Sequence, residues 1–164
     1  MNIPSIIPEL KVVSVREFPS EQMSDALKFL EFWRSVIEQS SWYDSQKEML
    51  IVVLLDTKHQ IIGFNLVSLG ILNETLFHPR EVLRPAVIAA AHAIVLMHNH
   101  PSGQPAPSEA DRLITGRMRK VSLIMGIELL DHIIVGDWWA IYSFHDSQAL
   151  ETGYEPLCRK KGGR

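Results

Sequence analysis

The spacing of apolar and polar residues along the chain predicts its helices and strands. A continuous apolar run from Met49 to Leu55 follows Glu48, and such a run is typical of a central strand buried on both faces. Alternating or short apolar segments predict further strands, and apolar residues at helical spacing predict helices. The predicted strands cover residues 10–18, 48–56, 61–69, 93–97, 127–135 and 138–144, and the predicted helices begin at Pro19, Pro79 and Ser108.

The sequence also predicts the ends or the buried face of each helix. Pro85 lies within the helix expected over 79–91, so that helix is either kinked or regular only from near Arg84. Gly126 is expected to end the helix that begins at Ser108. The inner face of the first helix is predicted to be Met23, Ala26, Leu27, Leu30, Trp33 and Ile37, and that of the last helix Leu113, Ile114, Met118, Val121 and Met125.

Helices and strands are interleaved along the sequence, which predicts an α/β fold with helices on both faces of one sheet. The segment 61–69 is expected to form a hairpin with the apolar strand before it. We divide the chain into an N-terminal strand and helix extension over 1–45, a main domain over 46–150, and a basic C-terminal tail over 151–164.

Composition narrows the class of protein. The chain has 164 residues, of which 46% are hydrophobic and 21% charged, as in a globular domain rather than a disordered chain. The single cysteine, Cys158, excludes an intrachain disulfide and a Cys-rich zinc site. The apolar runs are too short to cross a bilayer, and the N-terminus does not resemble a secretion signal. We therefore expect a cytoplasmic protein without membrane contact.

The charge distribution limits contact with nucleic acid. The net charge is −3, whereas a protein that wraps DNA or RNA along its surface needs an extended basic face. The densest basic cluster lies in the C-terminal tail, at Arg159, Lys160, Lys161 and Arg164. DNA is therefore expected to bind weakly if at all.

Two histidines and one carboxylate form the most informative pattern in the sequence. His98 and His100 are two residues apart at the end of a predicted strand, so both imidazoles would point to the same side of the sheet. Asp111 lies in the first turn of the next helix, behind a short proline-rich loop. Two histidines and a carboxylate leave a fourth tetrahedral position open, which is the pattern of a catalytic zinc site.

The spacing of His98, His100 and Asp111 alone does not decide between metal binding and a purely structural role. Histidine pairs are common on exposed strand ends, and Ser108 to Asp111 also fits a capping box at a helix start. The zinc-protease pattern His-Glu-x-x-His is absent, and one cysteine cannot supply the ligands of a zinc deaminase.

The sequence around these residues resembles that of a known family. His98-x-His100, seven further residues, and Ser108-x-x-Asp111 match the JAB/MPN (JAMM) metalloprotease signature. Segments 77–82, 98–103 and 126–137 resemble its RadC-like branch, and the resemblance covers about residues 46–145.

The resemblance implies a three-layer, cytidine-deaminase-like JAB/MPN fold in which helices flank a mixed sheet. It implies zinc bound by His98, His100 and Asp111, and a catalytic glutamate at Glu48, just before the apolar strand. Ser108 would help to stabilise the oxyanion of the reaction. His132 could support a ligand, although a purely structural role is favoured.

The main interpretation is a zinc-dependent hydrolase that cleaves a peptide or isopeptide bond in a protein or peptide. One alternative is a DNA-repair or recombination-associated binding protein, but residues 1–45 are too short for the helix-hairpin-helix region that RadC-like proteins often carry. Another alternative is a scaffold without activity, which would not need an intact ligand set. The substrate and the oligomeric state stay open, although an aromatic patch for a partner could form from Trp33, Trp42, Trp138 and Trp139.

Overall fold

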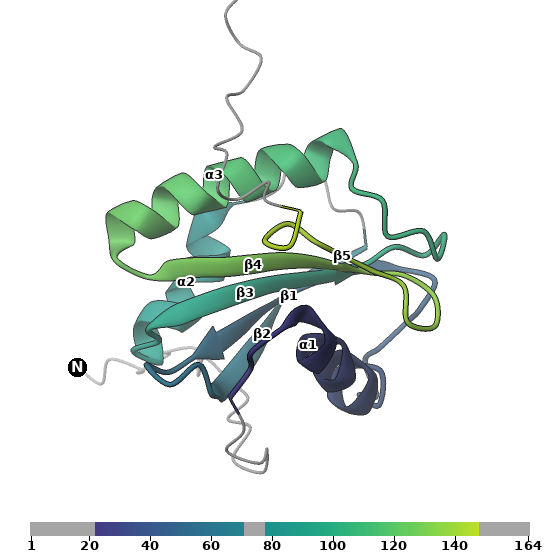
Figure 1. Cartoon of the computed structure of the whole chain (residues 1–164), viewed down its shortest axis with the longest axis horizontal. Coiled ribbons are helices and arrows are strands. Elements are labelled where there is room, and N and C mark those ends of the chain that lie inside the picture. The colour runs from purple at the N-terminus through teal and green to yellow at the C-terminus, as the bar shows by residue number, and fades with distance from the viewer. Residues whose placement is uncertain (1–21, 71–77, 148–164) are drawn as a thin grey trace, which may run out of the picture.

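A five-stranded mixed sheet forms the centre of the computed structural model, which describes residues 22–70 and 78–147 (Figure 1). The strand predicted over 10–18 and the helix start predicted at Pro19 lie outside the described residues. The strands are β1 (Glu48–Leu55), β2 (Ile61–Gly70), β3 (Ala93–Asn99), β4 (Glu128–Val135) and β5 (Ile141–Ser143). The helices are α1 (Ala26–Phe32) with a π-helical continuation η1 (Trp33–Ile37), α2 (Pro79–Ile88) and α3 (Glu109–Met125).

The order of the strands brings three chain segments to one edge of the sheet. The order is β2-β1-β3-β4-β5, with β1 antiparallel to both β2 and β3 and with β3 parallel to β4. The first residues of β1 therefore lie beside the last residues of β3, where Leu50 pairs with His98. The end of β4 lies at the same edge, where Val135 pairs with Asn99. Glu48 and the two candidate histidines are thus close although they are distant in sequence.

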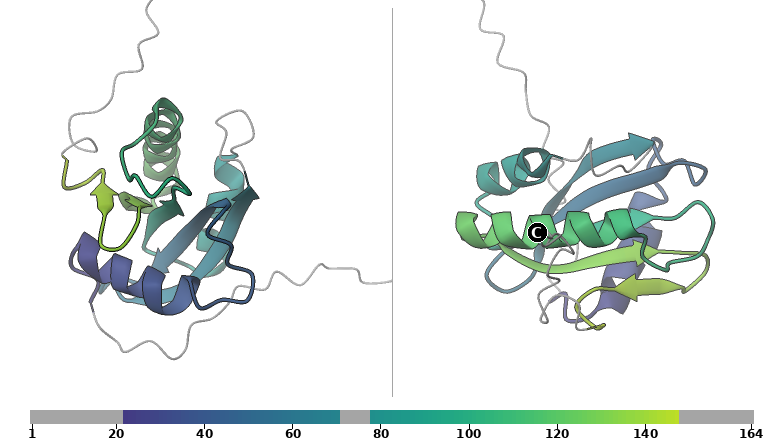
Figure 2. Two further views of the ribbon diagram at one scale, coloured as in Figure 1. Left: turned by 90° about the vertical axis from the view of Figure 1, so that its right-hand side faces the viewer. Right: turned by 90° about the horizontal axis from the view of Figure 1, so that it is seen from above.

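Helices cover both faces of the sheet, which confirms the predicted α/β architecture. α1 lies against one face, and α2 and α3 lie against the other (Figures 1 and 2). The alternate residues of β1 enter different cores: Met49 and Ile51 pack on the α1 side, and Leu50 and Val52 on the side of α2 and α3. The prediction of a strand buried on both faces is confirmed, as is the β1–β2 hairpin.

The first helix begins later than the sequence predicted. Residues 22–25 are not helical, and the Asp25 side chain caps α1 by accepting hydrogen bonds from the backbone N–H groups of Leu27 and Lys28. Leu27 is 56% exposed, so its predicted burial is wrong, and Phe29 and Phe32 are buried in its place. The predicted burial of Ala26, Leu30, Trp33 and Ile37 is confirmed.

The other two helices agree more closely with their patterns. α2 is helical from Pro79 and contains Pro85, so a start near Arg84 is wrong, and the helix ends at Ile88 rather than at residue 91. α3 ends at Gly126, whose φ of 67° is the left-handed conformation expected of a glycine in this position. Met125 is 48% exposed, however, and does not belong to the inner face.

The last strand is shorter than predicted because Trp138 lies in a turn. Trp138 has a φ of 53°, which no residue of a strand adopts, and β5 begins only at Ile141. Trp138 and Trp139 are exposed, whereas Trp33 is fully buried, so the four tryptophans do not form one patch. Among the described residues, no helix is both long enough and apolar enough to span a membrane.

Candidate metal centre

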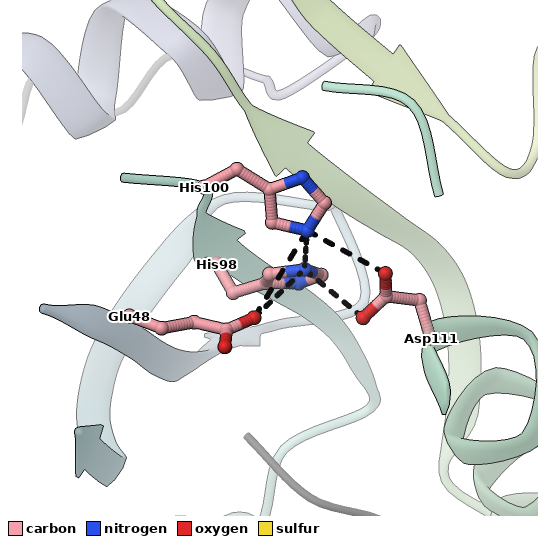
Figure 3. A group of neighbouring side chains, drawn as sticks. All are labelled: Glu48, His98, His100 and Asp111. Atoms are coloured by element: carbon pink, nitrogen blue, oxygen red, sulfur yellow. Dashed lines mark hydrogen bonds and ion pairs between the residues drawn. The ribbon is translucent and has the colours of Figure 1, made fainter. Parts of the chain in front are cut away.

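Four side chains from three elements converge at the edge where β1 begins and β3 ends. Glu48, His98, His100 and Asp111 each offer one ligand atom, and these atoms lie within 4.8 Å of one another (Figure 3). Glu48 opens β1, the histidines end β3 and follow it, and Asp111 lies in the first turn of α3. The structure thus brings together the three ligands and the glutamate that the sequence analysis selected.

A tightly packed loop returns the chain from β3 to α3. Residues 101–107 form this loop, and Gly103 adopts a φ of 76° within it. A Cβ on Gly103 would overlap the carboxylate of Asp137, and a Cβ on Gly136 would overlap the carbonyl oxygen of Gly103. Glycine is therefore required at both positions, where the loop meets the turn between β4 and β5.

Ser108 and Asp111 form the capping box that the sequence also allowed. The Ser108 hydroxyl and backbone N–H donate to Asp111 Oδ2 at 2.6 and 2.7 Å, and Ser108 Oγ accepts from the Asp111 N–H. The other carboxylate oxygen, Oδ1, lies 3.2 Å from His98 Nε2. Capping and ligation are therefore compatible, because each uses a different oxygen of Asp111.

The charge state of Asp111 suits a metal ligand. Burial raises the pKa of Asp111, but hydrogen bonds with His100 and His98 outweigh that effect and hold its pKa far below the usual range. The hydrogen bond with Asp111 raises the pKa of His100. His100 therefore binds a proton more readily beside this carboxylate, and a metal would compete with that proton.

The hydrogen bonds of the two rings direct one nitrogen of each towards the centre of the site. His100 Nδ1 lies 2.7 Å from the carbonyl oxygen of Gln104, so Nδ1 is the donor. His98 Nδ1 lies 2.9 Å from His132 Nε2. The Nε2 atoms of His98 and His100 are 3.1 Å apart and both face Asp111. Two ring nitrogens and a carboxylate in this arrangement are a donor set suited to zinc.

The distances distinguish three ligand positions from the glutamate. Ligand atoms about 2.0–2.1 Å from a tetrahedral ion are separated by about 3.3 Å. His98 Nε2 lies 3.1 Å from His100 Nε2 and 3.2 Å from Asp111 Oδ1. His100 Nε2 lies 3.5 Å from Oδ2, the other oxygen of the Asp111 carboxylate. Glu48 Oε1 lies farther away, at 3.7 Å from His98 Nε2 and 4.0 Å from His100 Nε2. The residues therefore fit a metal ion with three protein ligands, with Glu48 beside it.

Asn99 is a site residue that the sequence analysis missed. Its side chain accepts a hydrogen bond from the Met49 N–H and donates one to the Lys47 carbonyl, both at 3.0 Å. Asn99 thus binds the backbone on both sides of Glu48 and holds the start of β1 against the end of β3. Asn99 stands between the two histidines, so its side chain points to the other side of the strand. That position was the only sequence feature that could have indicated its role.

Thr115 was also missed as part of the site, and His132, for which the sequence analysis favoured a purely structural role, lies against the proposed ligand His98. His132 is fully buried on β4, and its ring lies between His98 and the Thr115 hydroxyl, which is 2.6 Å from Nδ1. Burial lowers the pKa of His132 well below its ordinary value. The neighbouring Asp131 does not contact His98. It accepts hydrogen bonds from the Ser143 hydroxyl and the His145 backbone N–H, and so connects β4 to β5 and to the residues after it.

A hollow of about 300 Å³ opens beside His100. It lies between η1, the end of β3 and the β4–β5 turn, and Tyr43 and Asp137 are among its lining residues. Arg34 of η1 donates to the carbonyl oxygens of Gly136 and Trp138 at 2.8 and 2.6 Å, and so fixes the turn at the rim of the hollow. Of the four convergent side chains, only His100 lines this hollow. The site meets solvent through the partly exposed side chains of His100 and Glu48.

Comparisons with known proteins match one family over most of the chain. The model of the RadC-like JAB domain family matches residues 23–150. A UPF0758 protein of Pelodictyon phaeoclathratiforme is 49% identical over 107 residues, which is 65% of this chain and 48% of that protein. A UPF0758 protein of Geobacter sulfurreducens is 52% identical over 94 residues, which is 57% of this chain and 41% of that protein. The chain spans about half the length of the curated relatives it matches.

Proposed function

The chain belongs to the RadC-like JAB domain family, and from this premise we propose that it is a zinc-dependent hydrolase that cleaves a peptide or isopeptide bond. The observation that carries the proposal is the arrangement of the four side chains. Two ring nitrogens face the carboxylate of Asp111 at ligand-to-ligand distances, while Glu48 stands slightly farther away. That difference is the one expected between metal ligands and a general base.

His98, His100 and Asp111 would hold the ion in this proposal. A bound zinc ion supplies Lewis-acid chemistry: it polarises a carbonyl group and lowers the pKa of water. The ordered hydrogen bonds of the two histidines and of Asp111 fix the ligand atoms before the ion arrives. Little reorganisation is then needed on binding.

Glu48 would act as the general base. Its carboxylate is within about 4 Å of both ring nitrogens and is 22% exposed, so a water molecule can reach it. Glu48 would accept a proton from the attacking water and return it to the leaving amine, which a carboxylate in this position can do in both steps.

Ser108 would help to stabilise the oxyanion that forms during the reaction. Its hydroxyl donates to Asp111 Oδ2 in the present structure, so this role requires the hydroxyl to rotate towards the substrate. The backbone N–H of Ser108 also donates to that oxygen and would keep Asp111 in place during the rotation. The expected signature of this role is a lower kcat in Ser108→Ala with zinc affinity largely retained.

A hydrolysis screen tests the proposed activity. Zinc-loaded protein is incubated with peptides made from a bacterial lysate, and with a peptide that carries an acylated lysine side chain, and new amines are identified by mass spectrometry. We expect cleavage by the wild-type chain and none by Glu48→Gln, which keeps the shape of the side chain and loses the base. No cleavage of either probe, or equal cleavage by both proteins, would count against the proposal.

A further inference from the structure

A chain of hydrogen bonds connects two of the proposed ligands through the interior of the protein. It begins at the backbone carbonyl of Asp111, to which the Thr115 hydroxyl donates at 2.6 Å. The same hydroxyl lies 2.6 Å from His132 Nδ1, and His132 Nε2 lies 2.9 Å from His98 Nδ1. The chain therefore links α3, β4 and β3, and it ends on the ring whose other nitrogen enters the site.

The direction of each hydrogen bond follows from the first one. A carbonyl oxygen only accepts, so the single proton of the Thr115 hydroxyl is directed at Asp111. Thr115 Oγ1 must then accept from His132 Nδ1–H. In the neutral His132 ring the other nitrogen, Nε2, carries no proton, so it accepts from His98 Nδ1–H. His98 Nε2 is thereby left with a lone pair that points into the site.

The burial of these groups allows no substitute partner. His132 is fully buried and Thr115 is 4% exposed, so water does not replace a lost hydrogen bond at either residue. The His132 ring is also fixed by stacking on Phe144, with ring centroids 5.2 Å apart and an angle of 9° between the planes. Packing determines where the ring lies, and Thr115 determines which of its nitrogens carries the proton.

We propose that Thr115 and His132 are positioning residues that set the tautomer of His98, so that Nε2 is presented to the metal. This inference rests on the proposed metal site. Neither residue offers a ligand atom to the metal: His132 acts through the His98 ring, and Thr115 acts through His132. Groups that orient a ligand in this way typically change metal affinity by about 10- to 100-fold when they are removed.

Two variants remove the hydrogen bonds while they keep the shape of the interior. His132→Phe retains an aromatic ring that can stack on Phe144, and Thr115→Val retains a branched side chain. We expect each to weaken zinc binding by about 10- to 100-fold in a competition titration with a chelator. His132→Gln and Thr115→Ser should recover most of the affinity, because an amide offers one donor and one acceptor group and serine keeps the hydroxyl.

Control measurements separate this role from a general loss of structure. His92→Phe makes the same replacement at an exposed position and should leave zinc affinity unchanged. The absorption spectrum of bound cobalt(II) should change in His132→Phe and Thr115→Val but not in the control. If a variant does not fold, the tautomers of the wild-type rings still test the proposal, since long-range ¹H–¹⁵N spectra should show Nδ1–H on both His98 and His132.

The outcomes distinguish this inference from the proposed function. Wild-type zinc affinity in both His132→Phe and Thr115→Val, or an Nε2–H tautomer of His132 in the wild-type chain, would overturn the inference and leave the metal site in place. Failure of the wild-type chain to bind zinc would overturn both.

Discussion

Replacement of Asn99 by leucine should destabilise the edge of the sheet that carries Glu48. The substitution keeps a side chain of similar size but removes the hydrogen bonds to the Met49 N–H and the Lys47 carbonyl. Met49 is completely buried, so its N–H is left without a partner, at a cost of about 1–3 kcal/mol. Lys47 is exposed, but the hydrogen bond to its carbonyl is partly buried, and its loss costs about 1 kcal/mol.

The sum predicts a loss of about 2–4 kcal/mol in the free energy of unfolding, or about 5–15 °C in Tm. Urea and thermal unfolding in the presence of a chelator measure this loss without a contribution from metal binding. Amide hydrogen exchange should show a matching loss of protection at Met49. The matched control is Asn65→Leu, because within the part of the chain that the structure describes the Asn65 side-chain amide donates only to the carbonyl of its neighbour Leu66.

The reasoning requires a clear difference between the two variants. Asn65→Leu should change the free energy of unfolding by less than about 1 kcal/mol. An Asn99→Leu variant within about 0.5 kcal/mol of the wild type, or one no less stable than Asn65→Leu, would refute the assigned role of Asn99.

Three further predictions follow from the site and from the charge of the chain. Glu48→Gln should retain its zinc and lose about 10²–10⁴ in hydrolysis rate against a peptide that the wild-type chain cleaves; a wild-type rate would move the base elsewhere. The hydrogen bond with Asp111 raises the pKa of His100, so protons should compete with zinc already above pH 6.5. Chelator titrations at a series of pH values should show zinc affinity falling as the pH is lowered towards 6.5. Constant zinc affinity down to pH 6.5 would contradict the assignment of His100 as a ligand. Any DNA binding should depend on the basic tail, fall with salt at a log–log slope of roughly −3 to −4 and vanish in a chain that ends at Tyr154; tight, sequence-selective binding by that shorter chain would favour the DNA-associated alternative.

The elements that the sequence predicted well are those whose pattern is local. The apolar run of β1 and the capping signals of α3 at Ser108 and Gly126 depend on neighbouring residues alone. The error in the last strand comes from a long-range contact. Trp138 lies in a turn held by Arg34, which is far away in sequence, and no periodicity within the last strand pair contains that information.

The candidate site divides in the same way. His98, His100 and Asp111 could be selected from the sequence because they are close along the chain. Two residues that are two apart on a strand point to the same side of the sheet, and a short loop leads to the helix that carries Asp111. Glu48 required the resemblance to a family, since its proximity depends on the pairing of β1 with β3. The partners of Thr115, His132 and Asn99 lie on other elements, so their hydrogen bonds follow only from the tertiary structure.

The zinc content of the purified chain tests the proposed centre most directly. Wild-type protein dialysed against a small excess of zinc should retain about one ion per chain by elemental analysis, and the double variant His98→Ala/His100→Ala should retain essentially none. Both proteins should first be shown to be folded by circular dichroism. Full zinc retention by the double variant, or no zinc in the wild-type chain, would contradict the assignment of these residues as the metal site.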